Sequence, residues 1–138
     1  MTTKMTRWAP AFLRIGMSLV ILWFGVEQLI DVTSWIGYLP EWTATLPISQ
    51  STLVYLNGSF EIIFGVFMLL GFYTRISALL LALHLFDIAY IVGYDAIGVR
   101  DFGLALSLFA IFLQGSDALC IDRSFSKATA SITTNEGK

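Results

Sequence analysis

The sequence has little charge and almost no cysteine or histidine, and each shortage excludes a class of protein. Only 13% of its 138 residues are charged, whereas soluble domains average about 25%. With 57% hydrophobic residues, the chain has more apolar surface than a small water-soluble domain can bury. The sequence has neither a basic cluster nor a nucleic-acid-binding motif, so we expect no nucleic acid as a partner. We therefore expect an integral membrane protein in contact with the lipid bilayer.

Cys120 is the only cysteine and His84 the only histidine. One cysteine excludes an intrachain disulfide, a dithiol redox pair and a multi-cysteine metal site. One histidine excludes a haem held between two histidines of the same chain. Di-iron bundles need Glu-x-x-His pairs on two helices, and this sequence lacks that repeat. We accordingly predict no metal site.

Four apolar runs have the length of membrane-spanning helices. About 20 residues, rising about 1.5 Å each, cross roughly 30 Å of hydrocarbon. The runs cover residues 11–30, 53–71, 76–94 and 100–114. Lys4 and Arg7 precede the first run as in a secretory signal, but Glu27 and Gln28 stand where a small-residue cleavage site would follow. We therefore predict that the first run is a retained helix.

These runs predict an all-α fold, an integral membrane antiparallel four-helix bundle. Small residues such as Gly58, Gly65 and Gly103 recur within the runs, and such residues allow helices to approach closely in lipid. The short connection at 72–75 predicts a tight helical hairpin. Residues 1–123 form the single transmembrane domain. The polar residues 124–138 lack apolar periodicity and are predicted to form a disordered cytoplasmic tail.

The connection between the first two runs has its own pattern, over residues 34–47. Trp35, Leu39, Trp42 and Leu46 recur at helical spacing, and prolines interrupt them. This pattern predicts a short amphipathic segment in the membrane interface. The segment is expected either to anchor the bundle through its aromatic residues or to screen an opening into it.

Basic residues predict the orientation of the chain. With four spans, both termini lie on the same side of the membrane. The basic residues expected on that side are Lys4, Arg7, Arg75, Arg123, Lys127 and Lys138, whereas Arg100 is expected on the opposite side. The positive-inside rule then places both termini in the cytoplasm, and we expect the inner (cytoplasmic) membrane as the location. Arg14 lies near the same side, so we expect it to snorkel toward water and anchor the first helix.

Ionisable side chains inside the runs are the first candidates for function. Glu61, His84 and Asp87 fall near the middle of two runs, where a charge costs roughly 2.5–3.5 kcal/mol on insertion scales. Asn57 shares a helix face with Glu61, and His84 shares one with Asp87. We predict that Glu61, His84 and Asp87 are the catalytic residues.

Six further residues are predicted to bind a cofactor beside these three. Such a set in an apolar, aromatic-walled slot would suit a quinone, which needs groups that bond its carbonyl oxygens and pass protons. The six predicted cofactor-binding residues are Trp23, Glu27, Asn57, Tyr90, Arg100 and Asp101.

The order of several short motifs resembles a known family. The motifs are Arg14-Ile15-Gly16, Trp23-Phe24-Gly25, Gly58-Ser59-Phe60-Glu61-Ile62-Ile63-Phe64-Gly65, Leu70-Gly71-Phe72-Tyr73-Thr74-Arg75 and Gly98-Val99-Arg100-Asp101-Phe102-Gly103. Together they are similar to the DoxX family of small membrane proteins, over residues 11–122. This resemblance implies a four-helix membrane protein and, for some members, a subunit of a thiosulfate:quinone oxidoreductase.

Three functions remain open from the sequence. The resemblance favours a quinone-interacting or accessory subunit of a membrane redox complex, with sulfur oxidation as one form of that role. A proton or small-solute pathway through Glu61, His84 and Asp87 is the second. A purely structural subunit, whose polar groups fix the packing of the bundle, is the third. Other redox subunits or a second copy of the chain are the expected protein partners.

Overall fold

A computed structural model describes residues 2–117 and 119–122 of the chain, and within these ranges the fold is all helical. The elements are α1 (Thr2–Ile30), α2 (Val32–Ile36), the 3-10 helix η1 (Glu41–Thr45), α3 (Gln50–Leu70), α4 (Thr74–Val92) and α5 (Ala96–Gln114). Four helices are long and apolar enough to cross a membrane, namely α1 from Thr6 onward, α3, α4 and α5. The prediction of an all-α, four-helix membrane fold is confirmed.

The ends of the helices are set by capping groups, which explains where the observed bounds differ from the apolar runs. The Asp95 carboxylate accepts a hydrogen bond of 2.6 Å from the backbone N–H of Ala96, so α5 begins four residues before the predicted run. Ser49 caps α3 through the N–H of Thr52 at 3.1 Å. At its other end, α3 stops at Gly71, whose φ of 71° lies in the left-handed region. The predicted tail at 124–138 lies outside the described residues.

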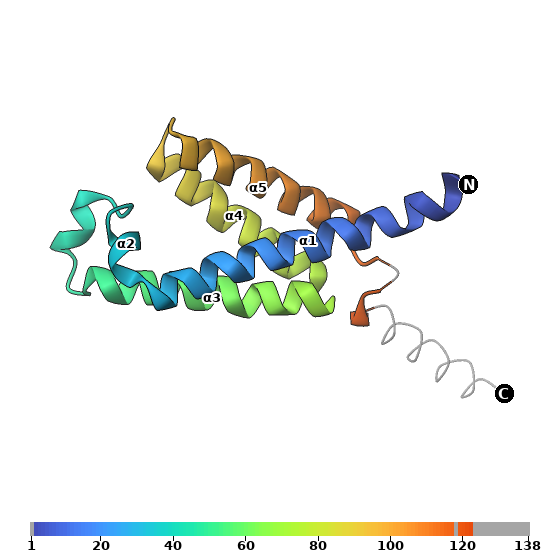
Figure 1. Ribbon diagram of the computed structural model, residues 1–138, viewed down its shortest axis with the longest axis horizontal. Coiled ribbons are helices and arrows are strands. Elements are labelled where there is room, and N and C mark those ends of the chain that lie inside the picture. The colour runs from blue at the N-terminus through green and yellow to red at the C-terminus, as the bar shows by residue number, and fades with distance from the viewer. Residues whose placement is uncertain (1, 118, 123–138) are drawn as a thin grey trace, which may run out of the picture.

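The long helices form two pairs, and the turn from α3 to α4 connects the pairs at one end of the molecule. Figure 1 shows α1 lying along α3 and α4 lying along α5. The connection that carries α2 and η1 lies at one end, which we call the capped end. The opposite end, which we call the clasp end, holds the turn from α3 to α4 and the segment after α5. The contacts between the two pairs are less extensive than those within each pair.

Two glycines bring α1 and α3 into backbone contact, as the small-residue pattern indicates. A methyl group on Gly58 would lie 2.8 Å from the carbonyl oxygen of Gly25, and one on Gly25 would lie 2.9 Å from that of Gly58. Real Cβ atoms do not come so close to another oxygen without displacement of the backbone. This close contact places the neighbouring side chains of α1 and α3 within hydrogen-bond distance of each other.

At the clasp end, Arg14 has a different role from the predicted one. Its side chain does not snorkel, because the residue is only 1% exposed. Its Nη1 donates to the carbonyl oxygens of Met68 and Leu69 at 2.7 and 2.6 Å, and its Nε donates to the Asp117 carboxylate at 2.7 Å. Arg14 thus caps the C-terminus of α3, whose last carbonyls lack helical partners.

A second carboxylate, that of Asp122, holds the start of α4. It accepts hydrogen bonds from the backbone N–H groups of Tyr73 and Thr74 at 2.8 and 2.9 Å, and the Asp122 N–H donates to the carbonyl oxygen of Gly71 at 3.1 Å. Cys120 packs against Gly71 so closely that a methyl group there would lie 2.5 Å from the Cys120 Cα. Residues 117 and 119–122 therefore fix the α3–α4 turn in place.

Candidate functional site

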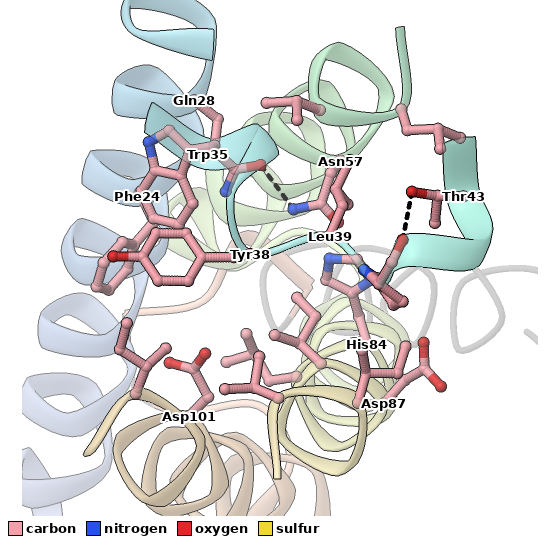
Figure 2. Close-up of a pocket in the computed structure, with 18 of the residues that line it drawn as sticks. Phe24, Gln28, Trp35, Tyr38, Leu39, Thr43, Asn57, His84, Asp87 and Asp101 are labelled. Carbon is pink, nitrogen blue, oxygen red and sulfur yellow. Dashed lines mark hydrogen bonds between the residues drawn. The ribbon is translucent and has the colours of Figure 1, made fainter. Parts of the chain in front are cut away.

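A cavity of about 290 Å³ lies between the two helix pairs at the capped end. We call it the pocket. Side chains from α1, α3, α4, α5 and the α2–η1 connection all line it, and Figure 2 shows how they surround the space. Most of the lining is apolar or aromatic, and a few polar groups converge on it from different helices. This composition is typical of sites that bind a small lipophilic molecule.

Three polar side chains of α1 and α3 form a hydrogen-bonded cluster at the pocket. Gln28 Nε2 donates to Glu61 Oε2 at 2.8 Å, and Gln28 Oε1 accepts from Asn57 Nδ2 at 2.6 Å. Asn57 Nδ2 also lies 3.4 Å from Glu61 Oε1. Glu61 and Gln28 are both only 2% exposed. The Gly25–Gly58 contact allows this cluster, because it brings Gln28 against the helix that carries Asn57 and Glu61.

His84 faces this cluster from α4. Its Nε2 lies 3.6 Å from Glu61 Oε1, and this buried nitrogen has no hydrogen-bond partner among the described residues. The ring of Phe60 lies against the imidazole, with centroids 4.8 Å apart. A buried donor or acceptor without a partner costs free energy. A small shift of either side chain would bring His84 Nε2 within hydrogen-bond distance of Glu61 Oε1, so the two groups are placed to exchange a proton.

Asp101 and Arg100 enter the pocket from α5. Arg100 Nε donates to Asp101 Oδ1 at 2.8 Å, and the guanidinium lies 4.5 Å from the ring centroid of Phe24 on α1. Asp101 is 4% exposed, whereas the Arg100 side chain is 40% exposed. The cation–π contact joins the two helix pairs at the capped end, and the ion pair leaves the Asp101 carboxylate inside.

The connection between α1 and α3 covers the pocket at the capped end. Trp35, Tyr38 and Trp42 line the cavity, and Trp35 packs edge-on against Phe24 with centroids 6.0 Å apart. Thr43 is buried and bonds Pro40 and Gln50. Of the two sequence-based expectations for residues 34–47, the arrangement fits a screen over an opening. These residues also supply most of the aromatic wall.

The structure brings together six of the nine predicted site residues. Those that line the pocket are Asn57, Glu61, His84, Asp87, Arg100 and Asp101. Asp87 differs from the others in that no described residue bonds its carboxylate, and the residue is exposed, as Arg100 is. Figure 2 shows it on α4 beyond His84, at the edge of the group.

The other three predicted residues do not line the pocket. Trp23 and Tyr90 are exposed on the outer faces of α1 and α4, and Tyr90 belongs to a separate groove between α4 and α5. Glu27 is half-buried next to Gln28, but the helix turns about 100° per residue and directs the two side chains differently. Tyr90 lies six residues after His84, so the helix places it on another face.

Gln28 was not among the predicted site residues, although it is the centre of the cluster. The sequence contained one signal for it, since Gln28 is three residues after Gly25 and shares a face of the first helix with it. Trp35 and Trp42 were predicted to lie in a segment that either anchors the bundle or screens an opening, whereas Tyr38 was not singled out. Within the described ranges, no three His, Cys, Asp or Glu side chains are grouped so that they could hold a metal ion.

Comparison with known proteins identifies the family. No match was found among curated proteins or among solved structures. A sequence model of the DoxX family matches residues 9–93, which include α1 from Ala9 onward, α3, α4 and the polar cluster of the pocket. The match covers more than half of the chain and agrees with the four membrane-spanning helices. This multi-pass membrane protein belongs to the DoxX family.

Proposed function

We propose that this protein binds a quinone in the pocket and acts as the membrane subunit of a redox complex. The observation that carries the proposal is the pair of His84 and Glu61 at an aromatic-walled cavity, where the buried Nε2 of His84 lies 3.6 Å from the Glu61 carboxylate and has no closer polar partner among residues 2–117 and 119–122. After a small shift of the imidazole toward the cavity, this nitrogen would bond a quinone oxygen. Glu61 and His84 would together store and deliver the protons that accompany quinone reduction.

The shape and composition of the pocket support a quinone headgroup. Its volume of about 290 Å³ lies at the small end of the range for ligand pockets, which is roughly 300–1,000 Å³. Phe24, Trp35 and Tyr38 offer flat apolar surfaces for the ring, and the polar atoms lie on two sides of it. A quinone, when bound, takes up two electrons and two protons. Gln28 and Asn57 orient Glu61 toward His84, so their role is to position the proton-carrying pair.

Electrons must reach the pocket from another protein. The chain has one cysteine, and this thiol lies at the clasp end, far along the helices from the pocket. We therefore propose a partner subunit that carries the redox group. A partner that oxidises a sulfur compound would match the thiosulfate:quinone oxidoreductases to which the family resemblance points.

We also propose that the protein lies in the inner membrane with both termini in the cytoplasm, so that the pocket faces the outer leaflet. Tyr94→Cys at the capped end and Ser116→Cys at the clasp end test this, because both positions are exposed. The native Cys120 is 4% exposed and gives a low background. A membrane-impermeant thiol reagent on intact cells should label only Tyr94→Cys. Labelling of Ser116→Cys instead would reverse the orientation.

A proton pathway is the second candidate function, and the position of Asp87 favours it. This exposed carboxylate lies one helical turn from His84, which in turn faces the buried Glu61. Such a series could carry protons from the surface to the pocket without any quinone. Proton flux into proteoliposomes under a pH gradient separates the candidates: flux that needs Asp87 and no quinone would favour the pathway.

The decisive experiment measures quinone binding by the full-length protein in nanodiscs. A decyl-tailed benzoquinone is titrated against the native protein, His84→Phe and a Glu41→Gln control outside the pocket. We expect saturable binding by the native protein and the control, and about fivefold weaker binding by His84→Phe, because one hydrogen bond is lost. No binding by the native protein would refute the proposal. A purely structural role would be favoured if Glu61→Gln also kept full cellular function.

A further inference from the structure

The two most deeply buried carboxylates of the pocket lie on opposite helix pairs. Glu61 belongs to α3 and Asp101 to α5, and they are 2% and 4% exposed. Figure 2 shows Asp101 pointing into the pocket on the side opposite Gln28 and Asn57. A ring bound between the helix pairs would therefore meet a carboxylate at each of two edges.

Both carboxylates have hydrogen-bonding capacity that the protein leaves unused. Asp101 Oδ1 accepts from Arg100 Nε at 2.8 Å, whereas its Oδ2 accepts no hydrogen bond from residues 2–117 or 119–122. Glu61 Oε1 has only the 3.4 Å contact with Asn57 and the 3.6 Å approach of His84. A carboxylate oxygen has two acceptor sites. Each carboxylate can thus accept a further hydrogen bond from a ligand.

The other buried polar side chains of the pocket are already engaged with each other. Gln28 uses its amide nitrogen on Glu61 and its amide oxygen on Asn57. Thr43 Oγ1 donates to the Pro40 carbonyl oxygen and accepts from Gln50. Gln28 keeps one unused amide N–H. The unused capacity deep inside the pocket is therefore mainly that of the carboxylate acceptors, with this N–H and His84 Nε2 as the donors beside them.

The excess of unused acceptors over unused donors in the pocket distinguishes the two redox forms of a quinone. The oxidised ring has two carbonyl oxygens, which only accept hydrogen bonds, and so it cannot bond an ionised carboxylate. The reduced ring has two hydroxyl groups, each of which can donate to one. Hydrogen bonds to a charged group are also stronger than those between neutral groups.

We propose that the pocket binds the hydroquinone more tightly than the quinone, with Asp101 accepting from one ring hydroxyl and the Glu61–His84 pair facing the other. This inference rests on the proposed function and names the redox form that the site prefers. Tighter binding of the reduced form raises the midpoint potential of the bound couple, by about 30 mV for each factor of ten in affinity. The pocket then favours transfer of electrons to the quinone from the partner subunit.

The test uses the full-length protein in nanodiscs and a decyl-tailed benzoquinone, titrated anaerobically in its oxidised and its reduced form. We expect the hydroquinone to bind about tenfold more tightly or better, because it makes a charge-assisted bond that the quinone cannot make. Asp101→Asn should reduce the preference to about threefold or less, since the amide group can also donate to a carbonyl oxygen. Asp101→Glu keeps a carboxylate and should keep the direction of the preference.

Asp95→Asn is the matched control, because it removes one carboxylate at the same end of α5 outside the pocket, and asparagine caps a helix as well as aspartate does. It should bind both redox forms as the native protein does. Equal affinities of the native protein for the two forms, or tighter binding of the quinone, would overturn the inference while leaving quinone binding intact. A preference that survives in Asp101→Asn would overturn the role of Asp101. If neither form binds, the proposed function itself fails and this inference fails with it.

Discussion

Arg14 and Asp117 form a buried ion pair that joins the first membrane helix to the segment after the last one. The Nε of Arg14 lies 2.7 Å from Oδ2 of Asp117, and both side chains are 2% exposed. The same guanidinium bonds two carbonyl oxygens at the end of α3. One side chain thus connects three parts of the chain that are far apart in the sequence.

Loss of either charge at this pair should destabilise the protein. We expect Arg14→Met to lower the free energy of unfolding by about 3 kcal/mol or more, since a buried charge is left without its partner. Asp117→Leu should act in the same direction. The double variant should be less unstable than the sum of the two single variants, because no unpaired charge then remains. Denaturant unfolding in detergent micelles measures all three, and additive effects would show that the two groups do not interact.

Acid should weaken the clasp end through Asp122. Burial acts to raise the pKa of Asp122, but hydrogen bonds from the Thr74 and Tyr73 N–H groups outweigh it and hold that pKa below its usual value. The stabilisation is therefore present above the ordinary carboxyl pKa, about 3.9, and is lost as the pH falls below that value toward the pKa of the folded state. Melting temperatures across pH 7 to 3 should fall more for the native protein than for Asp122→Asn. Parallel curves would mean that Asp122 is not responsible.

The contact between α1 and α3 should not tolerate a methyl group at Gly58. A Cβ there would lie 2.8 Å from the Gly25 carbonyl oxygen and 3.0 Å from the Gln28 Cβ. We expect Gly58→Ala to cost about 1–3 kcal/mol of stability and to weaken quinone binding, because α1 must move away with Gln28. Gly103→Ala is the control, since that position faces open space. The control should be neutral or slightly stabilising because alanine favours helix. Equal effects of the two variants would contradict the close contact.

Glu61→Gln should abolish proton delivery without removing the hydrogen-bonded cluster, because glutamine is almost the same size. We expect quinone-linked turnover of the assembled complex in membranes to fall by about 10² or more. Quinone affinity should change far less than turnover. Glu41→Gln, which alters an exposed carboxylate at the same end of the molecule, should leave both unchanged. Full turnover in Glu61→Gln would remove Glu61 from the proposed proton path.

The fold could be predicted from the sequence because lipid imposes a simple requirement on length and hydropathy. The buried carboxylate of the site, Glu61, could be predicted for the same reason, since a carboxylate in a membrane helix must find a partner. The partner itself, Gln28, depends on which face of α1 meets α3, and the Gly25–Gly58 contact decides that in three dimensions. The positions of Trp23 and Tyr90 could not be predicted in this way, because aromatic residues suit a ligand-binding wall and a lipid-facing surface equally well.

The role of Arg14 could not be deduced from its position near the end of a helix. An arginine there can reach water, and only the return of the chain after α5 supplies Asp117 as a buried partner. That pairing spans 103 positions in the sequence. Local patterns carry no information about so distant a neighbour.

The unequal fastening of the two ends has a mechanical consequence. Hydrogen bonds of 2.6 to 3.0 Å, donated by the Arg14 guanidinium and accepted by the Asp122 carboxylate, hold the clasp end. Across the pocket, by contrast, the helix pairs meet through the Arg100–Phe24 contact and the 3.6 Å approach of His84 to Glu61. A rotation of α4 and α5 as a rigid unit would therefore have its pivot at the clasp end. Small angular changes there would produce their largest displacements at Asp101 and His84, so the cavity can widen for a guest while the rest of the bundle keeps its packing.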